Sequence, residues 1–168
     1  MKKLIFLRHA KSSWEEPVLD RDRSLSSRGI KTIQGVAQHW KNLFNEAECI
    51  FTSPANRALH TSTILAHTIG YDLLNIRISE ELYTFNPKDL LAFIKKIDDA
   101  LLNVVIVGHN PAFSEVSQKL STDNAPTLRT SCWTQLTFQT NKWSSIEYGS
   151  SISGSRKSLN VYERTTNK

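Results

Sequence analysis

The chain has 168 residues, of which 39% are hydrophobic and 22% are charged, and its formal net charge at pH 7 is +5. These values are typical of one ordinary globular domain, so we expect a single domain over residues 1–168. The two cysteines are far apart, which argues against a disulfide framework and a cysteine metal site. No apolar run is long enough for a signal peptide or a membrane span, so we expect a cytoplasmic protein.

Hydrophobic spacing predicts alternating strands and helices in the first two thirds of the chain. The predicted strands lie at residues 3–7, 48–53, 73–79 and 103–108, and the predicted helices at residues 24–44, 53–70, 86–98 and 111–121. A long polar connection over residues 10–24 separates the first strand from the first helix, and such connections are often functional. Ser53 is the predicted N-cap of the second helix, with Pro54 at its first helical position and Gly70 at its end.

The last third of the chain changes character. Residues 132–140 alternate between the two faces of a predicted strand, and residues 142–148 and 158–164 also look extended. The Ser/Gly-rich residues 149–158 predict a flexible loop. The whole pattern predicts an α/β fold with three layers, α/β/α, in which helices cover both faces of a mostly parallel central sheet.

Polar residues follow three of the predicted strands, at the point where each strand ends. Arg8 and His9 follow the first strand, the stretch SPANR with Arg57 follows the second, and GHNP with His109 follows the strand at residues 103–108. Because the carboxyl ends of parallel strands meet at one edge of the sheet, we expect these two arginines and two histidines to converge there. Each stretch alone is also an ordinary surface pair, helix start or capped turn; the combination is what points to a site.

This set of side chains suits a phosphoryl group. Arginine offers a planar fork of donors to phosphoryl oxygens, and the amino ends of helices favour anions. An unprotonated imidazole is a nucleophile near neutral pH, while a protonated one donates to the developing charge. The basic excess of the chain fits either a solvated surface or attraction to such an anionic substrate. Basic and aromatic residues do not alternate along the chain as they do in proteins that bind single-stranded nucleic acid, so we expect no nucleic-acid partner.

The motifs LRHAKSSW, DRDRSLSSRG, SPANRA and VGHNP resemble those of the histidine phosphatase superfamily, which includes the phosphoglycerate mutases. The resemblance runs from about residue 4 to residue 140. Ala10 stands where the superfamily usually has glycine; with the short length and the residues that follow, this looks most like the SixA-type phosphohistidine phosphatases. The resemblance implies a phosphoglycerate mutase-like α/β/α fold and an enzyme that needs no metal or other cofactor.

The resemblance also implies roles for single residues. His9 would be the nucleophile and carry a phosphohistidine intermediate, while Arg8, Arg57 and His109 would bind the phosphoryl group. Ser13 would add a donor from the loop. The pair Asp20 and Arg23 is interpreted as structural, holding the loop over the site.

The proton donor is a separate question. Glu81 is the carboxylate in the best position after the third predicted strand, and its alternative is a solvated loop glutamate. A donor is dispensable for one substrate class, because the imidazole of a protonated phosphohistidine leaves as a neutral group.

The sequence leaves three hypotheses for the function of the protein. The first is a phosphatase that removes phosphate from phosphohistidine on a protein, the second is a phosphatase of small phosphate monoesters, and the third is a non-catalytic phosphate-binding module. The intact His9 argues against the third, and the shortness of the chain argues against a mutase. The sequence predicts no particular oligomeric state. His39, His60 and His67 lie in predicted helices without the acidic ligand that a metal site would need.

Overall fold

A computed structural model describes residues 1–155 of the chain. The strands are β1 (Lys2–Arg8), β2 (Cys49–Thr52), β3 (Arg77–Ile78), β4 (Asn103–Gly108), β5 (Trp133–Phe138) and β6 (Ser150–Gly154). The helices are α1 (Ser27–His39), α2 (Lys41–Phe44), α3 (Asn56–Ile69), α4 (Pro87–Lys95) and α5 (Ala112–Leu120). Short 3-10 helices are η1 (Asp20–Asp22), η2 (Leu73–Asn75), η3 (Glu80–Leu82) and η4 (Trp143–Ser145).

The strands form one sheet in the order β3-β2-β4-β1-β5-β6. The first four strands in this order run parallel; β5 pairs antiparallel with β1, and β6 pairs antiparallel with β5. The mostly parallel sheet that the sequence predicts is therefore confirmed. The order also places β2, β4 and β1 side by side, so the three strands that end in polar motifs are direct neighbours.

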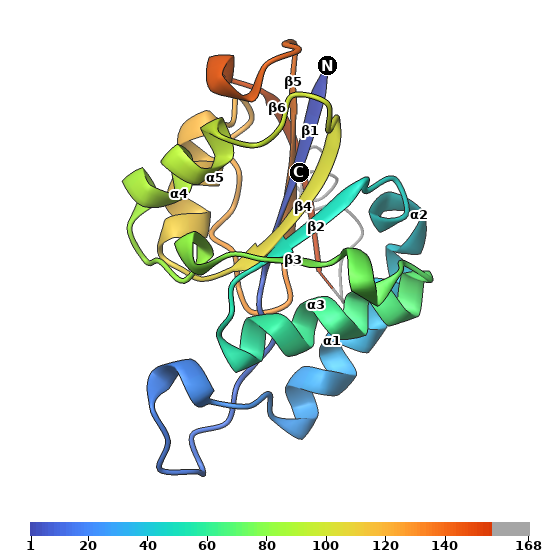
Figure 1. The fold of residues 1–168 in the computed structure, drawn as a ribbon, viewed down its shortest axis with the longest axis vertical. Coiled ribbons are helices and arrows are strands. Elements are labelled where there is room, and N and C mark those ends of the chain that lie inside the picture. Colours follow the sequence, from blue (N-terminus) through green and yellow to red (C-terminus); the bar gives the residue numbers. More distant parts are fainter. Residues whose placement is uncertain (156–168) are drawn as a thin grey trace, which may run out of the picture.

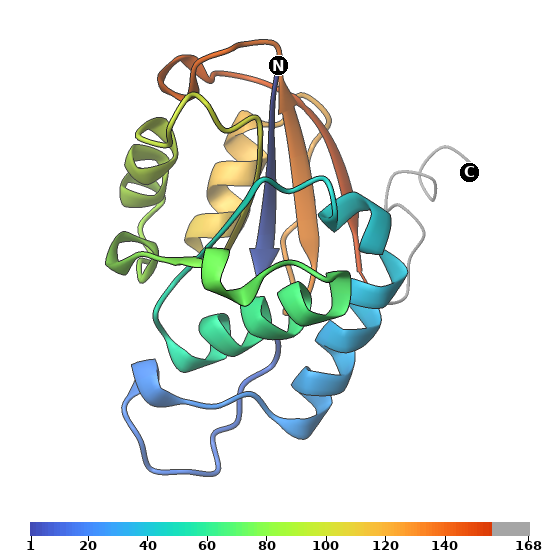
Figure 2. The same ribbon diagram turned by 45° about the vertical axis from the view of Figure 1, so that its right-hand side comes forward.

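Helices cover both faces of the sheet, as Figures 1 and 2 show. Side chains of a strand point alternately to the two faces. In β1, Leu4 and Phe6 pack into the core beneath α4 and α5, whereas Ile5 and Leu7 pack into the core beneath α1 and α3. The three-layer α/β/α arrangement is thus a consequence of apolar residues at successive positions of the central strands. Within residues 1–155, no helix has both the length and the apolar character to cross a membrane.

Two helix boundaries differ from the predicted ones. The first predicted helix is divided at Trp40, where α1 ends and α2 begins. The second, α3, starts at Asn56 with Ala55 as its N-cap, so Ser53 is not the N-cap. Ser53 instead accepts a hydrogen bond from the Ala55 N–H within the turn between β2 and α3. Gly70 ends this helix in a left-handed conformation, as the sequence predicts.

The C-terminal third departs furthest from the sequence prediction. The predicted loop at residues 149–158 begins instead with strand β6, and its small residues serve packing, because a Cβ on Gly154 would lie 2.7 Å from the ring of Trp133. The predicted extended segment 142–148 contains the turn η4, where buried Trp143 donates from Nε1 to the Leu101 carbonyl. The predicted strand at residues 158–164 lies outside the described residues.

Strand β3 is also shorter than the predicted strand over residues 73–79. Only Arg77 and Ile78 pair with β2, and the turn η2 precedes them. Strand β4 and the start of α4, where Asn86 caps the Lys88 N–H, agree with the prediction.

Candidate active site

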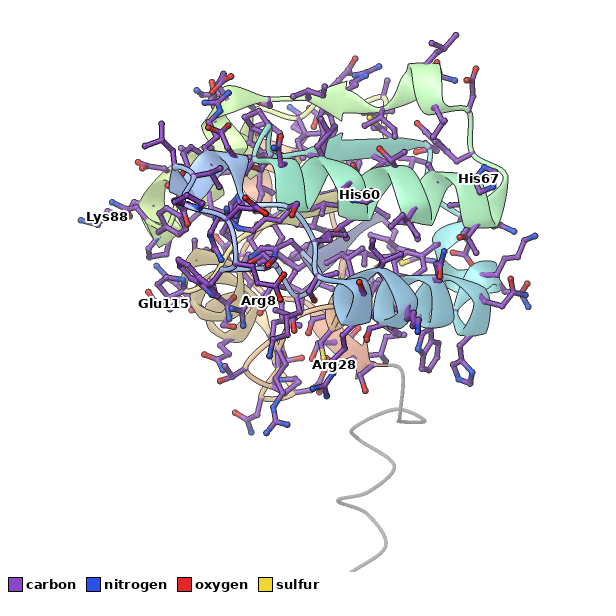
Figure 3. All side chains as sticks on the ribbon, turned by 90° about the horizontal axis from the view of Figure 1, so that it is seen from below. Arg8, Arg28, His60, His67, Lys88 and Glu115 are labelled. Atoms are coloured by element: carbon purple, nitrogen blue, oxygen red, sulfur yellow. The ribbon has the colours of Figure 1, made fainter. Side chains whose placement is uncertain are left out.

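An open pocket of about 340 Å³ lies at the carboxyl end of the parallel strands. Figure 3 views the molecule from this end, with Arg8 near the centre of the picture. The long connection after β1 passes below the sheet in Figure 1 and forms one side of the pocket. The lining residues are Arg8, His9, Lys11, Ser12, Trp14, Asp20, Arg23, Arg57, Phe85, His109, Asn110 and Thr130.

His9 is held rigidly at the end of β1. Its backbone N–H donates to the Gly108 carbonyl of β4, which continues the ladder of the sheet beyond the strand. Its ring Nδ1 lies 2.7 Å from the carbonyl oxygen of Ala10. A carbonyl only accepts, so Nδ1 carries the proton and Nε2 carries the lone pair. The Arg57 Nε–H donates to this Nε2 at 3.3 Å, which agrees with the same tautomer.

Burial lowers the pKa of His9 to about 4, and the positive charges of Arg57 and Arg8 act in the same direction. The hydrogen bond to the Ala10 carbonyl opposes this shift only in part. The ring is therefore neutral at pH 7, with an unprotonated Nε2 inside the pocket. That is the state a nucleophilic imidazole requires.

Arg57 lies in the first turn of α3 and is 2% exposed. Besides its contact with His9, it donates from Nη1 to the Asp20 carbonyl at 2.6 Å and from Nη2 to the Asp20 carboxylate at 2.9 Å. The guanidinium is thus fixed by three separate contacts. A group with this many fixed donors beside a nucleophile is preorganised for an oxyanion.

His109 faces His9 with 5.2 Å between the two ring centroids. Its Nε2 lies 2.7 Å from the Ser53 hydroxyl, while its buried Nδ1 has no hydrogen-bond partner within residues 1–155. When Ser53 donates to Nε2, Nδ1 carries the proton and is available to a phosphoryl oxygen. Burial lowers the pKa of His109 to about 3, and the neighbouring His9 and Arg57 add to the shift.

Arg8, the last residue of β1, also lines the pocket. It donates from Nη1 to the Leu128 carbonyl at 3.0 Å. Its buried Nε has no partner in the described part of the chain. Burial lowers the pKa of Arg8 below its ordinary value, and the charge of Arg57 lowers it further.

Sequence analysis did not predict the direct contact between Asp20 and Arg57. The carboxylate of this loop residue accepts from Arg57 in the pocket, from the Tyr83 hydroxyl at 2.8 Å and from Arg23, contacts that are compatible with the predicted role of holding the loop over the site. Burial favours a higher pKa for Asp20, but the hydrogen bonds from Tyr83 and Arg57 and the nearby positive charge lower its pKa on balance. The signal in the sequence is the stretch DRDRSLSSRG, which begins at Asp20 inside the long polar connection.

The structure brings four predicted site residues together: Arg8, His9, Arg57 and His109. Ser13 does not line the pocket, since its hydroxyl accepts from the Glu15 N–H; its neighbour Ser12 lines it and accepts from Arg23.

Glu81 is not brought into the pocket either. It is exposed in η3, and one of its carboxylate oxygens lies 3.5 Å from Nζ of Lys96. Its role as proton donor stays a prediction that the geometry does not favour.

The remaining histidines lie apart from the pocket. Figure 3 shows His60 and His67 on α3, away from Arg8. In residues 1–155, His, Cys, Asp and Glu side chains do not gather in groups of three or more that could hold a metal ion. The pocket itself is lined by the guanidinium groups of Arg8, Arg23 and Arg57, by the neutral imidazole of His9 and by a second imidazole, His109. Chemically, this arrangement can bind a tetrahedral oxyanion and attack its central atom.

Comparisons with known proteins agree with this geometry. A family model described as "Histidine phosphatase superfamily (branch 1)" matches residues 4–89. The chain is 35% identical over 112 residues to the uncharacterized protein Rv1276c of Mycobacterium tuberculosis, an alignment that covers 66% of this chain and 67% of that protein.

Solved structures are similar in fold at low identity. The protein histidine phosphatase SixA, complexed with tungstate, matches with a TM-score of 0.77 and 18% identity over 92% of this chain and 97% of that chain. Mycobacterial glucosyl-3-phosphoglycerate phosphatase matches with a TM-score of 0.63 and 17% identity over 89% and 99% of the respective chains. These similarities concern the fold and say nothing by themselves about the substrate.

Proposed function

Because this chain belongs to the histidine phosphatase superfamily (branch 1), we propose that it is a phosphatase in which Nε2 of His9 takes the phosphoryl group of the substrate and passes it to water. Its three-layer α/β/α fold is the phosphoglycerate mutase-like fold that the sequence predicted. The observation that carries the proposal is the state of His9, a buried neutral imidazole whose lone pair is on Nε2, in contact with the buried Arg57.

The reaction has two displacement steps. In the first, the lone pair of His9 Nε2 forms a bond to phosphorus while the bond from phosphorus to the leaving group breaks. In the second, a water oxygen attacks phosphorus, the bond to Nε2 breaks, a proton of the water is lost to solvent or phosphate, and His9 returns to its neutral form. Arg8, Arg57 and His109 hold the three phosphoryl oxygens in both steps. Phosphoryl transfer needs mainly this positioning and charge stabilisation, and the proposed reaction uses no metal ion.

We further propose phosphohistidine on a protein as the substrate. Asp20 is the only carboxyl group among the described residues that line the pocket, and its lowered pKa keeps it ionised, so it is a poor proton donor. An alcohol leaving group needs such a donor, whereas the imidazole of a protonated phosphohistidine does not. The fold is also similar to a protein described as a protein histidine phosphatase.

The test is to incubate the wild-type protein with a phosphohistidine peptide that carries labelled phosphate. We expect an acid-labile, alkali-stable label on the protein, and a loss of turnover of at least about a thousandfold in His9→Ala, since no other group can replace the nucleophile. His60→Ala, which removes an exposed histidine of α3, should keep wild-type activity.

Two results would contradict the proposal: label on a serine, or full turnover by the His9→Ala protein. A parallel assay with small phosphate esters distinguishes the second substrate class. Faster turnover of an ester than of the peptide would keep the chemistry at His9 and overturn the assignment of a phosphohistidine substrate.

A further inference from the structure

A second open pocket, also of about 340 Å³, adjoins the active site. It shares Lys11 and Thr130 with the active-site pocket, so the two form neighbouring depressions on one face. Figure 3 shows Arg28 near the start of α1, toward the margin of the face that carries Arg8. The lining residues are Lys11, Arg28, Thr32, Arg129, Thr130, Ser131, Cys132 and Ser155.

The lining carries three positive charges and no carboxylate. The side chains of Lys11, Arg28 and Arg129 are exposed, and none of the ion pairs found among residues 1–155 includes any of them. Like charges gathered around one hollow repel each other unless an anion lies between them. The hydroxyl group of Thr130 adds a neutral donor of the kind that holds oxyanions, whereas the Thr32 hydroxyl donates to the Arg28 carbonyl.

The backbone brings Lys11 and Arg28 together. The carbonyl oxygen of Lys11 accepts from the Ser26 N–H and from the Ser26 hydroxyl at the start of α1. It also lies so close to Gly29 that a Cβ at this position would clash with it. A glycine in the first turn of α1 is therefore required for the loop after His9 to contact the helix that carries Arg28.

The opposite wall is tied to the catalytic strand. The Ser131 N–H donates to the carbonyls of Arg8 and His9, and Ser131 has a φ of 62°, a left-handed conformation that is unusual for serine. Its hydroxyl is buried and has no hydrogen-bond partner in the described part of the chain. Backbone strain of this kind and an unsatisfied buried hydroxyl are features that cluster at binding sites.

We propose that this second pocket is a subsite for a further anionic group of the substrate, a carboxylate or a second phosphoryl group, bound beside the phosphoryl group at His9. The inference rests on the proposed function and makes it more specific, because it predicts a substrate that carries at least two oxyanions. On a phosphohistidine protein, the second oxyanion is an acidic side chain next to the phosphohistidine; on a small molecule it is a second phosphate. Lysine and arginine around one hollow recognise both by the same chemistry.

The peptide arm of the test compares two phosphohistidine peptides that differ only in having aspartate or asparagine beside the phosphohistidine. For the wild-type protein, we expect kcat/KM to be about tenfold higher for the aspartate peptide, mainly through KM, with a preference that shrinks as salt screens the exposed charges. The double variant Arg28→Gln/Arg129→Gln should use the two peptides equally. The control Lys88→Gln/Lys95→Gln removes two exposed charges from α4, outside both pockets, and should keep the preference.

The binding arm needs no turnover. Calorimetry compares methylphosphonate with a series of alkane bisphosphonates of increasing spacer length, using the same three proteins. The best bisphosphonate should bind the wild-type protein about tenfold more tightly than methylphosphonate does, and the Arg28→Gln/Arg129→Gln protein should lose this advantage.

The outcomes separate the possible sources of the anion. A preference in the peptide arm assigns the subsite to an acidic protein flank, and a preference in the bisphosphonate arm alone assigns it to a small bisphosphorylated substrate. Equal values in both arms, or a preference that the Arg28→Gln/Arg129→Gln protein keeps, overturn the subsite. Failure of the proposed function is read separately, as the absence of a labelled His9.

Discussion

The two neighbouring pockets at the carboxyl end of the sheet both contain basic residues, but most of these residues are buried in one pocket and all are exposed in the other. In the active-site pocket, Arg57 is 2% exposed and His9 is 7% exposed, and both are held by hydrogen bonds to fixed partners. In the second pocket, Lys11 and Arg28 are exposed and form no ion pair within residues 1–155. The positive charge of Arg57 is therefore held in one position, whereas the charges of Lys11 and Arg28 are free to adapt.

This difference in burial suits the two pockets to different tasks. A buried, oriented donor acts in a low dielectric and loses nothing to reorganisation when charge develops, so it serves chemistry. An exposed cation is screened by water and salt and contributes weakly, so it serves the recognition and attraction of an anion. Changes to the nucleophile and the buried donors of the first pocket should lower turnover strongly, whereas changes to Arg28 and Arg129 of the second should alter the choice of substrate.

The largest predicted effect is at Arg57. Arg57→Gln should lower kcat/KM by about a hundredfold to a thousandfold, because it removes the charge and the fixed fork of donors beside His9. Arg57→Lys should recover little of this loss, since a point charge cannot make the three contacts of the guanidinium. Steady-state kinetics of both variants checks this, with the exposed Arg77→Gln of β3 as the control. A loss below tenfold would contradict the role of Arg57 as a fixed donor and would mean that it contributes as weakly as the exposed cations of the second pocket.

The next prediction concerns pH. Because burial lowers the pKa of His9 to about 4, the nucleophile stays unprotonated well below neutral pH. Activity should be level from about pH 8 to pH 5 and fall roughly tenfold per unit as the pH drops below about 4. The measurement needs a phosphate ester that survives acid, with circular dichroism to show that the protein stays folded. A midpoint near 6.5, the ordinary value for histidine, would mean that His9 is solvated like the groups of the second pocket.

The smallest predicted effects compare two carboxylates. Glu81→Gln should change ester hydrolysis by less than about twofold, because Glu81 is exposed and paired with Lys96 outside the pocket. Asp20→Asn should lower the inhibition constant of inorganic phosphate by about threefold, because the ionised Asp20 competes with phosphate for Arg57. Inhibition assays on the two variants check both values. A large loss in Glu81→Gln would restore Glu81 as the proton donor.

Part of the site was predictable because it follows from the ends of strands. Arg8, His9, Arg57 and His109 each stand just beyond a strand that the apolar pattern predicts, and parallel strands bring their carboxyl ends to one edge. The convergence was therefore expected without knowledge of the strand order. The order β2-β4-β1 then makes these ends direct neighbours, so that the two histidine rings lie 5.2 Å apart.

Other features of the site depend on the conformation of loops, which the hydrophobic pattern of the sequence does not predict. Asp20 reaches Arg57 because the connection after β1 folds back against α3, and Ser53 contacts His109 from the turn between β2 and α3. The second pocket is built from residues of three separate segments, with Lys11, Arg28 and Arg129 far apart in the sequence.

The sequence by itself therefore determined the layers of the fold, the central parallel strands and the convergence of Arg8, His9, Arg57 and His109, because the alternation of apolar residues and the strand ends are local properties of the chain. Only the tertiary structure decided the protonation state of His9, the pairing of Arg57 with Asp20, the exclusion of Glu81 from the pocket and the gathering of cations beside it. Each of these depends on burial or on contacts between distant segments. Such contacts exist only once the loops are packed against the sheet.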